Sequence, residues 1–121
     1  MGKYVIKQGK TGPYFVLKAA NGEPIGKSEV YSSEAAAKNG AESVKKNAAA
    51  AQIEDQTVEG WKNMTNPVFE LYKDKAGEFR FRLRAKNGEP ILASEGYSAK
   101  ASAIGGIESV KKNADSEIVT E

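Results

Sequence analysis

The chain has 121 residues, with 18 lysines and arginines against 16 aspartates and glutamates, and it contains neither cysteine nor histidine. Its length is that of one compact domain, and the lack of cysteine excludes disulfides, thiolate nucleophiles and cysteine-ligated metals. Histidine is the commonest general base and the commonest ligand of transition metals, so its absence leaves no metal site or cofactor to expect. A net charge of +2 is too small to predict a polyanionic partner.

The sequence contains an internal duplication. Residues 21–48 and 87–114 both begin with Asn-Gly-Glu-Pro-Ile and both end with Glu-Ser-Val-Lys-Lys-Asn-Ala, at a spacing of 87 − 21 = 66 residues. Two copies of one supersecondary unit are expected to pack against each other, because about sixty residues bury too little surface to be stable alone. We predict a single pseudo-symmetric domain over residues 1–121, with repeat one at 3–59, a connector at 60–67 and repeat two at 68–121.

In chain order, each repeat opens with two predicted strands joined by a glycine-containing turn, the first strands lying at residues 4–7 and 69–72. The second strand is clearest in repeat two, because its apolar and basic side chains alternate with a period of two. The apolar ones are Phe79, Phe81, Leu83 and Ala85, and the basic ones are Arg80, Arg82 and Arg84. Asn-Gly then predicts a hairpin turn in both repeats, and third strands are expected at 25–31 and 91–97.

A helix is predicted after the third strand of each repeat. Ser32 and Ser98 are the expected N-caps, and the helices are expected to end near Lys46 and Lys112. Their apolar stripes are equivalent: Ala37, Ala41, Val44 and Ala48 in repeat one, and Ala103, Ile107, Val110 and Ala114 in repeat two. A short last strand is predicted within 51–59 and 116–120, so the unit is β-β-β-α-β, present twice.

Three further residues carry expectations about packing. Gly40 and Gly106 lie in mid-helix, where each costs about 1 kcal/mol relative to alanine. Because the cost recurs in both repeats, we expect a close approach of each helix to the sheet or to the other helix. The alternative is exposed backbone that contacts a ligand. Trp61, the only tryptophan, is expected to pin the connector to the core rather than to stack on a ligand.

The tandem Asn-Gly-Glu, Ser-Glu-x-Tyr-Ser and Gly-x-Glu-Ser-Val-Lys-Lys-Asn-Ala motifs closely resemble those of the YegP-like family of small bacterial proteins, over essentially the whole chain. The resemblance implies an α+β fold in which two β(3)-α-β units share one antiparallel sheet and exchange their C-terminal strands. Single-unit members are expected to do this as homodimers, whereas a tandem chain forms the pseudo-dimer as a monomer. Residues 53–58 suit the exchange, since they follow the first helix just before repeat two begins. We expect both helices on one face of the sheet. The resemblance supplies no catalytic or ligand residues.

Arg80, Arg82 and Arg84 are the first candidate binding residues, because arginines on one face of a strand can engage successive phosphates. The alternative is a solvated face with cross-strand ion pairs. Glu95 is the expected partner on that face, opposite Arg80 with a two-residue turn or opposite Arg82 with a four-residue loop.

Glu29 and Glu95, in the repeated Ser-Glu, are the other candidates. They can act as an acid–base pair only around a cleft, and structural pairing is the preferred interpretation.

The residues do not disclose a function. We expect a small non-enzymatic binding or protein-interaction module with an unknown partner, which uses the sheet face that the helices leave uncovered. The alternative is weak nucleic-acid or anion binding through the three arginines, and an enzyme that uses Glu29 or Glu95 ranks third. The longest apolar run, residues 48–51, is far too short for a membrane span, and no signal peptide is visible. A cytoplasmic location without membrane contact is therefore expected.

Overall fold

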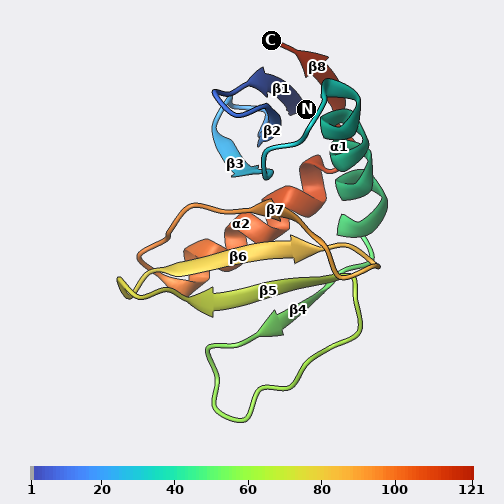
Figure 1. The fold of residues 1–121 in the computed structure, drawn as a ribbon. Helices are drawn as coiled ribbons and strands as arrows, with labels where there is room; N and C mark the ends of the chain where they lie inside the picture. Colours follow the sequence, from blue (N-terminus) through green and yellow to red (C-terminus); the bar gives the residue numbers. More distant parts are fainter. Residues whose placement is uncertain (1) are drawn as a thin grey trace.

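The structure is a computed structural model that describes residues 2–121. Within these residues, eight strands form one sheet and two helices pack against it (Figure 1). The elements are β1 (Lys3–Gln8), β2 (Pro13–Lys18), β3 (Pro24–Lys27), α1 (Glu34–Ala48), β4 (Gln52–Asp55), β5 (Val68–Lys73), β6 (Phe79–Arg84), β7 (Pro90–Ala93), α2 (Lys100–Asn113) and β8 (Glu117–Thr120). Neither of these helices has the length and apolar character needed to cross a membrane.

The two repeats exchange their last strands. The sheet order is β4-β5-β6-β7-β3-β2-β1-β8, so β4 of repeat one pairs with β5 of repeat two, and β8 of repeat two pairs with β1 of repeat one. The predicted exchange is confirmed. The prediction of an antiparallel sheet was wrong in one respect. Both exchanged strands run parallel to their new neighbours, so the sheet is mixed. A strand that arrives by a long connection, rather than by a tight turn, can take this orientation.

The sheet face beneath the helices, the inner face, is nearly the same in both repeats. Tyr4 and Phe15 pack edge to face with their ring centroids 5.8 Å apart, and Phe69 and Phe81 do the same at 6.0 Å. The predicted apolar stripes of both helices are buried in one core with these rings. The repeated residues of the sequence are therefore chiefly residues of the core.

The mid-helix glycines make room for tyrosines. A Cβ atom on Gly106 would lie 2.6 Å from Tyr97 Oη and 2.8 Å from Phe81 Cε2, and one on Gly40 would collide with the hydroxyl of Tyr31. Both glycines are buried. The predicted close approach to the sheet is confirmed, and the alternative of exposed, ligand-contacting backbone is wrong.

The predicted helix caps were wrong by one residue. The N-cap of α1 is Ser33, whose Oγ accepts a hydrogen bond from the Ala36 N–H at 3.1 Å, and the N-cap of α2 is Ala99, which makes no such bond. Neither Ser32 nor Ser98 caps a helix. The chain is still held by the sheet just before them, because the Tyr31 N–H donates to the Pro13 carbonyl at 2.7 Å, and the helix therefore begins later.

The repeats meet at a seam between β3 and β7. Lys27 and Ala93 are the residues in register there, and they are equivalent positions, since 93 − 27 = 66. A pseudo-twofold axis therefore passes between them. The residues next to this axis differ: Leu92 is 2% exposed, and its equivalent Gly26 leaves the space that Leu92 fills, since a Cβ there would lie 3.0 Å from Leu92 Cγ.

The prediction that Trp61 pins the connector to the core was wrong. Trp61 is 43% exposed, and Val58 and Met64 nearby are also exposed. The segment runs outside β4 (Figure 1) and is held by its backbone, since the Met64 N–H donates to Glu54 Oε1 at 2.6 Å. A buried carboxylate that accepts this bond anchors the connector without help from the indole ring.

Candidate functional site

The sheet face opposite the helices, the outer face, carries one row of residues in register across the sheet. From edge to edge, this outer row is Glu54, Glu70, Arg82, Ala93, Lys27, Val16, Val5 and Val119. Its charged end lies on β4, β5 and β6, which we call the ionic half. Its apolar end lies on β2, β1 and β8, which we call the valine half. The two halves of the molecule thus share an inner face but not an outer one.

The ionic half is organised around Glu70. Arg82 Nε and Arg84 Nε lie 2.5 Å and 2.8 Å from Glu70 Oε1, and the Arg82 guanidinium stacks 4.7 Å from the centroid of the Tyr72 ring. Burial raises the pKa of Glu70, but hydrogen bonds from Arg82 and Arg84 outweigh it and hold the pKa below its usual value. The Glu70 carboxylate is therefore ionised at neutral pH and neutralises arginine charge on β6.

A second carboxylate extends this cluster. Glu54 is 2% exposed and lies opposite Glu70 on β4. The Gln56 side-chain amide donates to both, at 2.7 Å to Glu54 Oε2 and 3.3 Å to Glu70 Oε2. With the Met64–Glu54 hydrogen bond and the ion pairs of Glu70, these bonds join β4, the connector and β6 into one polar network.

Arg80, the third arginine, has a separate partner. Its Nε lies 2.5 Å from Asp74 Oδ2, and its Nη1 donates to the Ser94 carbonyl at 3.5 Å. The side-chain hydrogen bond from Arg80 lowers the pKa of Asp74, so this pair is also charged at neutral pH. All three arginines thus lie on the predicted face and are ion-paired, but to Glu70 and Asp74 rather than to Glu95.

Glu95 stays apart because β7 ends at Ala93, which lies opposite Arg82. At the next residue, Ser94 Oγ accepts a hydrogen bond from the Phe81 N–H at 2.9 Å and donates to the Glu95 carbonyl at 2.8 Å. Glu70 was missed at the sequence level. The signal was available: Glu70 lies in the strand before the arginines, and the alternation of residues 69–72 puts its side chain on the same face as theirs.

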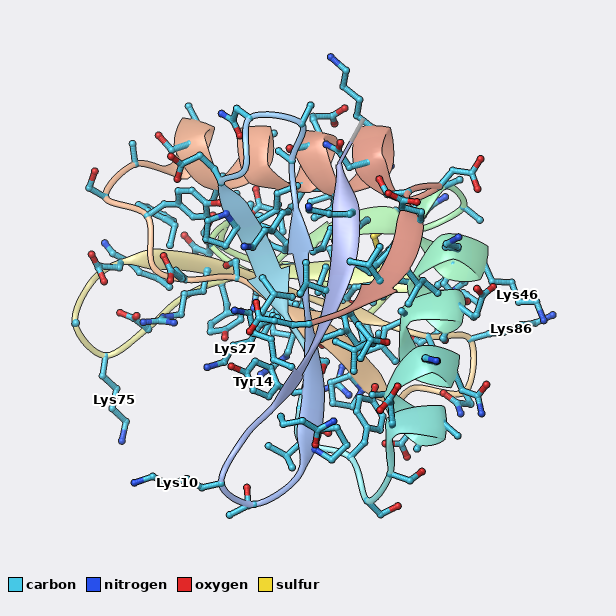
Figure 2. The ribbon with its side chains drawn as sticks, turned by 90° about the horizontal axis from the view of Figure 1, so that it is seen from above. Lys10, Tyr14, Lys27, Lys46, Lys75 and Lys86 are labelled. Atoms are coloured by element: carbon cyan, nitrogen blue, oxygen red, sulfur yellow. The ribbon has the colours of Figure 1, made fainter. Side chains whose placement is uncertain are left out.

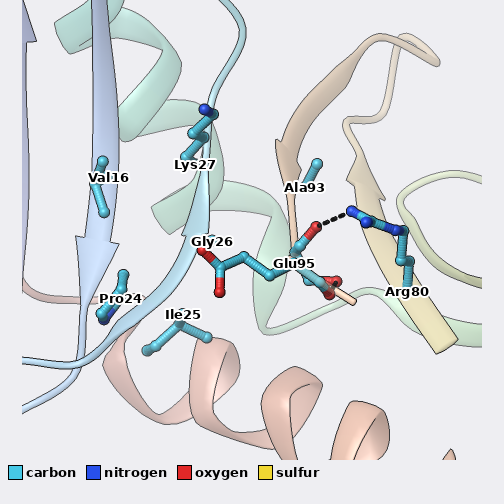
Figure 3. Close-up of a pocket in the computed structure, with 9 residues that line it drawn as sticks. Val16, Pro24, Ile25, Gly26, Lys27, Arg80, Ala93 and Glu95 are labelled. Carbon is cyan, nitrogen blue, oxygen red and sulfur yellow. Dashed lines mark hydrogen bonds between the residues drawn. The ribbon is translucent and has the colours of Figure 1, made fainter. Parts of the chain in front are cut away.

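Two grooves flank the pair of Lys27 and Ala93 on the outer face. The first groove has a volume of about 600 Å³ and is shown in Figure 3. It is lined by Val16, Pro24, Ile25, Gly26, Lys27, Arg80, Ala93, Ser94 and Glu95. The second groove, of about 250 Å³, is lined by Lys27, Ser28, Glu29, Tyr72, Arg82, Arg84, Pro90, Leu92 and Ala93. Ser28 and Glu29 are the equivalents of Ser94 and Glu95, so the grooves are related by the pseudo-twofold axis.

The structure divides the sequence-predicted binding residues between these grooves. Arg80 and Glu95 line the first, whereas Glu29, Arg82 and Arg84 line the second. Figure 3 shows the Glu95 carboxylate turned across the first groove toward Gly26 and away from Arg80. Because Glu29 and Glu95 lie in different grooves, they do not face each other across one cleft.

The rest of the repeated Ser-Glu-x-Tyr motif serves the fold. Ser28 repeats the hydrogen bonds of Ser94, accepting from the Phe15 N–H at 2.9 Å and donating to the Glu29 carbonyl at 2.8 Å. Burial, and then the charge of Glu95, raise the pKa of Tyr97, so its phenol is neutral at neutral pH. Of the Ser, Glu and Tyr side chains of this motif, the two glutamates are therefore the ones that do not stabilise the fold.

Lys27 is the cation nearest the centre of the outer face. Its ammonium lies 5.8 Å from the centroid of the Tyr14 ring, and Figure 2 shows the two side chains side by side. No ion pair holds Lys27 among the residues that the structure describes. Across the same residues, no group of three or more acidic side chains could hold a metal ion.

Comparison with known proteins places both repeats in one family model. The domain of unknown function DUF1508 matches residues 10–55 and 74–121. The UPF0339 protein YegP of Yersinia pestis is 40% identical over 122 residues, covering all of this chain and 96% of the relative. The solution structure of yegP from E. coli, a protein of unknown function, has a TM-score of 0.79 at 32% identity and covers 98% of this chain and 90% of that one.

Other relatives match one repeat. A UPF0339 protein of Treponema denticola is 57% identical over 53 residues, which is 44% of this chain but 91% of the relative. A UPF0339 protein in the ptx operon 5' region of Stutzerimonas stutzeri is 68% identical over 47 residues, 39% of this chain and 42% of the relative, so the match spans less than half of that protein. A single repeat is thus nearly the whole of one relative, as expected for a duplicated unit.

Proposed function

This chain belongs to the DUF1508 family of unknown function, and we propose that it acts without catalysis, as a module that binds a short peptide segment of a partner protein in the first groove. The observation that carries the proposal is the chemistry of that groove. Apart from the ion-paired Arg80, it presents one cation and one carboxylate, Lys27 and Glu95, beside apolar residues that include Ile25. A peptide segment with an apolar side chain between an acidic and a basic one matches this arrangement.

The other charge in the first groove is already satisfied. Arg80 is bound to Asp74 and to the Ser94 carbonyl, so a ligand would have to displace one of these to use it. Lys27 and Glu95 have no such partner in the residues described. Ligand recognition therefore falls on two side chains that lie on opposite repeats, which only the assembled pseudo-dimer brings together.

Two features support a role without catalysis. The two repeated glutamates lie in separate grooves, and the hydroxyls of Ser28 and Ser94 already bond to the backbone. A nucleic-acid role has less support, because Glu70 and Asp74 neutralise charge on the arginine strand, and phosphates would compete with these short ion pairs.

The test is an NMR titration of the 15N-labelled protein with three acetylated tripeptide amides, Asp-Val-Lys, Asp-Val-Asp and Lys-Val-Lys, and with short DNA and RNA at two salt concentrations. We expect the mixed-charge peptide to shift the amides of Val16, Lys27 and Glu95. Lys27→Met and Glu95→Gln should each weaken binding about two- to five-fold, as expected for one exposed charge contact. Lys75→Met is the control, because Lys75 does not line the groove and its side chain projects from a hairpin tip, away from Lys27 (Figure 2).

Two outcomes would contradict the proposal. One is that none of the peptides shifts the groove amides. The other is that oligonucleotides shift the amides of Arg80, Arg82 and Arg84 with an affinity that falls steeply with salt, which would favour the nucleic-acid function instead.

A further inference from the structure

The two edges of the sheet are protected differently. At one edge, the connector runs outside β4 and bonds to it through Met64 and Glu54 (Figure 1). At the other edge, β8 is the last strand, and nothing else in residues 2–121 pairs with it. Ile118 and Val119 of β8 are half-buried, and its two terminal residues are exposed. Natural proteins usually cover, shorten or charge such an edge, because its unpaired backbone can accept another strand.

The backbone of β8 presents a regular set of free groups. The Glu121 N–H donates to the Ile6 carbonyl at 3.0 Å, so Glu121 and the alternate residue Val119 direct their backbone groups toward β1. The N–H and C=O groups of Ile118 and Thr120 consequently point to the free edge. These two donors and two acceptors are what an added strand requires for main-chain pairing.

The side chains of this edge specify the chemistry of such a strand. Val119 ends the apolar part of the outer row, continuing from Val5 and Val16, which are 5% and 8% exposed. Glu117 and Glu121 flank it on the same face, two residues to either side. An added strand with an apolar side chain beside Val119 would lengthen the valine row, and basic side chains two residues away would meet the glutamates.

The same charges argue against a second copy of this chain. Antiparallel pairing of two β8 edges through Ile118 and Thr120 would centre on Val119 and set Glu117 of each copy opposite Glu121 of the other. Directly opposed like charges destabilise a strand pair. In the structure Glu121 is bound to Lys7 at 3.2 Å, whereas Glu117 has Lys3 opposite it on β1 without an ion pair among the described residues. Glu117 is therefore the more available charge.

We propose that β8 is a docking edge that takes an extended partner segment of the pattern basic–x–apolar–x–basic as a ninth strand. The edge lies two strands beyond β2, the nearest of the strands that line the first groove, so the two sites are separate. Main-chain hydrogen bonds to Ile118 and Thr120 hold the segment, and Val119 with Glu117 and Glu121 select its side chains.

The test is an NMR titration with the peptide acetyl-Gly-Lys-Thr-Val-Thr-Lys-Gly-amide and with the same peptide carrying glutamate in place of lysine. We expect the lysine peptide to shift the amides of residues 117–121 and 3–7, and to bind at least ten-fold more tightly than the glutamate peptide. Amide exchange adds an independent readout. In the free protein, Ile118 and Thr120 should exchange faster than Val119, and the lysine peptide should slow them.

Three variants separate main-chain from side-chain recognition. Thr120→Pro removes one outward N–H without removing a bond to β1, so it should abolish binding. Thr120→Ala controls for the hydroxyl, which bonds to Glu34 at 3.3 Å, and should retain it. Glu117→Lys should reverse the preference between the two peptides, and this prediction stands even if the proline variant does not fold.

Three results would overturn the proposal: no shift at β8 with the lysine peptide, equal binding by the Thr120→Pro and Thr120→Ala variants, or a dimer of the free protein that Thr120→Pro disrupts. The last result would assign the edge to a second copy. Shifts confined to the first groove are a case of the first result and would leave the proposed function standing.

Discussion

The ionic half and the valine half have the same backbone fold but carry different side chains on their outer faces. In the ionic half, Glu70 and Arg82 occupy neighbouring strands as an ion pair, and their equivalents in the valine half are Val5 and Val16. Beneath them, the inner face keeps an equivalent aromatic pair and an equivalent helix stripe. The comparison shows that the core specifies this fold, since the centre of the outer face accepts either an ion pair or a pair of valines at equivalent positions.

The largest expected effect comes from separating the halves. A polypeptide of residues 1–59 lacks β8 beside β1 and β5 beside β4, and each half is too small to offset two missing strand pairs. We expect it to be unfolded or to form a dimer that restores both pairings. Light scattering and NMR would test this, and a folded monomer at all concentrations would show that the halves do not depend on each other.

The shared inner face predicts equal sensitivity at Gly40 and Gly106. Alanine at either position would press its Cβ on a half-buried tyrosine, and we expect each variant to lower the free energy of unfolding by about 1–3 kcal/mol. Gly105, the neighbour of Gly106, is the matched control because open space surrounds its Cβ position. Gly105→Ala should raise stability by up to about 1 kcal/mol in urea titrations. Equal melting of all three variants would refute the tight inner face.

The different outer faces predict that the ion pair is replaceable. Glu70→Gln leaves Arg82 and Arg84 without a charged partner, and we expect a loss of about 1–2 kcal/mol, limited by solvent because both arginines are about one-third exposed. The double variant Glu70→Val, Arg82→Val copies the valine half and should recover most of that loss. Urea unfolding compares them, and a double variant weaker than Glu70→Gln would mean that the network has no apolar substitute.

The smallest effect concerns the contact between each exchanged strand and the start of a helix. In one half Asp55 binds Lys100 at 2.6 Å, and in the other Thr120 donates to Glu34 at 3.3 Å. Burial raises the pKa of Asp55, but hydrogen bonds from Lys100 and Thr57 outweigh it and lower the pKa overall. At neutral pH, Asp55→Asn should cost up to about 1 kcal/mol, and Thr120→Ala about half as much.

The pH dependence of the Asp55 contact follows from the sign of its shift. In the unfolded chain the pKa of Asp55 is about 3.9, and in the folded protein it is lower. The stabilisation is therefore fully present above the unfolded pKa and is lost as the pH falls through the folded pKa. The deficit of Asp55→Asn should therefore shrink between pH 7 and pH 2. A deficit that stays constant would show that Lys100 does not stabilise the carboxylate.

The sequence predicted the inner face well because packing repeats itself in a duplicated chain. The helix stripes, the close approach at the mid-helix glycines and the alternating strand of Phe79 and Phe81 all follow from local patterns. The exchanged strands followed from the family resemblance, and their parallel direction did not, since pairing partners distant in sequence leave no local periodicity.

The outer face was harder to predict because its contacts depend on register. Either turn length made Glu95 the expected partner of the arginines, but β7 ends at Ala93 before reaching Glu95. The structure pairs the arginines with Glu70 and Asp74 of the β5–β6 hairpin instead. Trp61 misled for a related reason. Its size suggested burial, but a hydrogen bond between Glu54 and Met64, invisible in the sequence, already fixes the connector.

Covalent fusion has a consequence at the pseudo-twofold axis. Were the two units separate and identical chains, every side chain at the axis would meet its own copy, and Lys27 would confront another lysine. Here Lys27 faces Ala93, and Leu92 fills a space that Gly26 vacates. In each of these pairs, a residue packs against a different residue of the other unit rather than against a copy of itself. The two units have therefore become specific for each other, in the way that heterodimer subunits are.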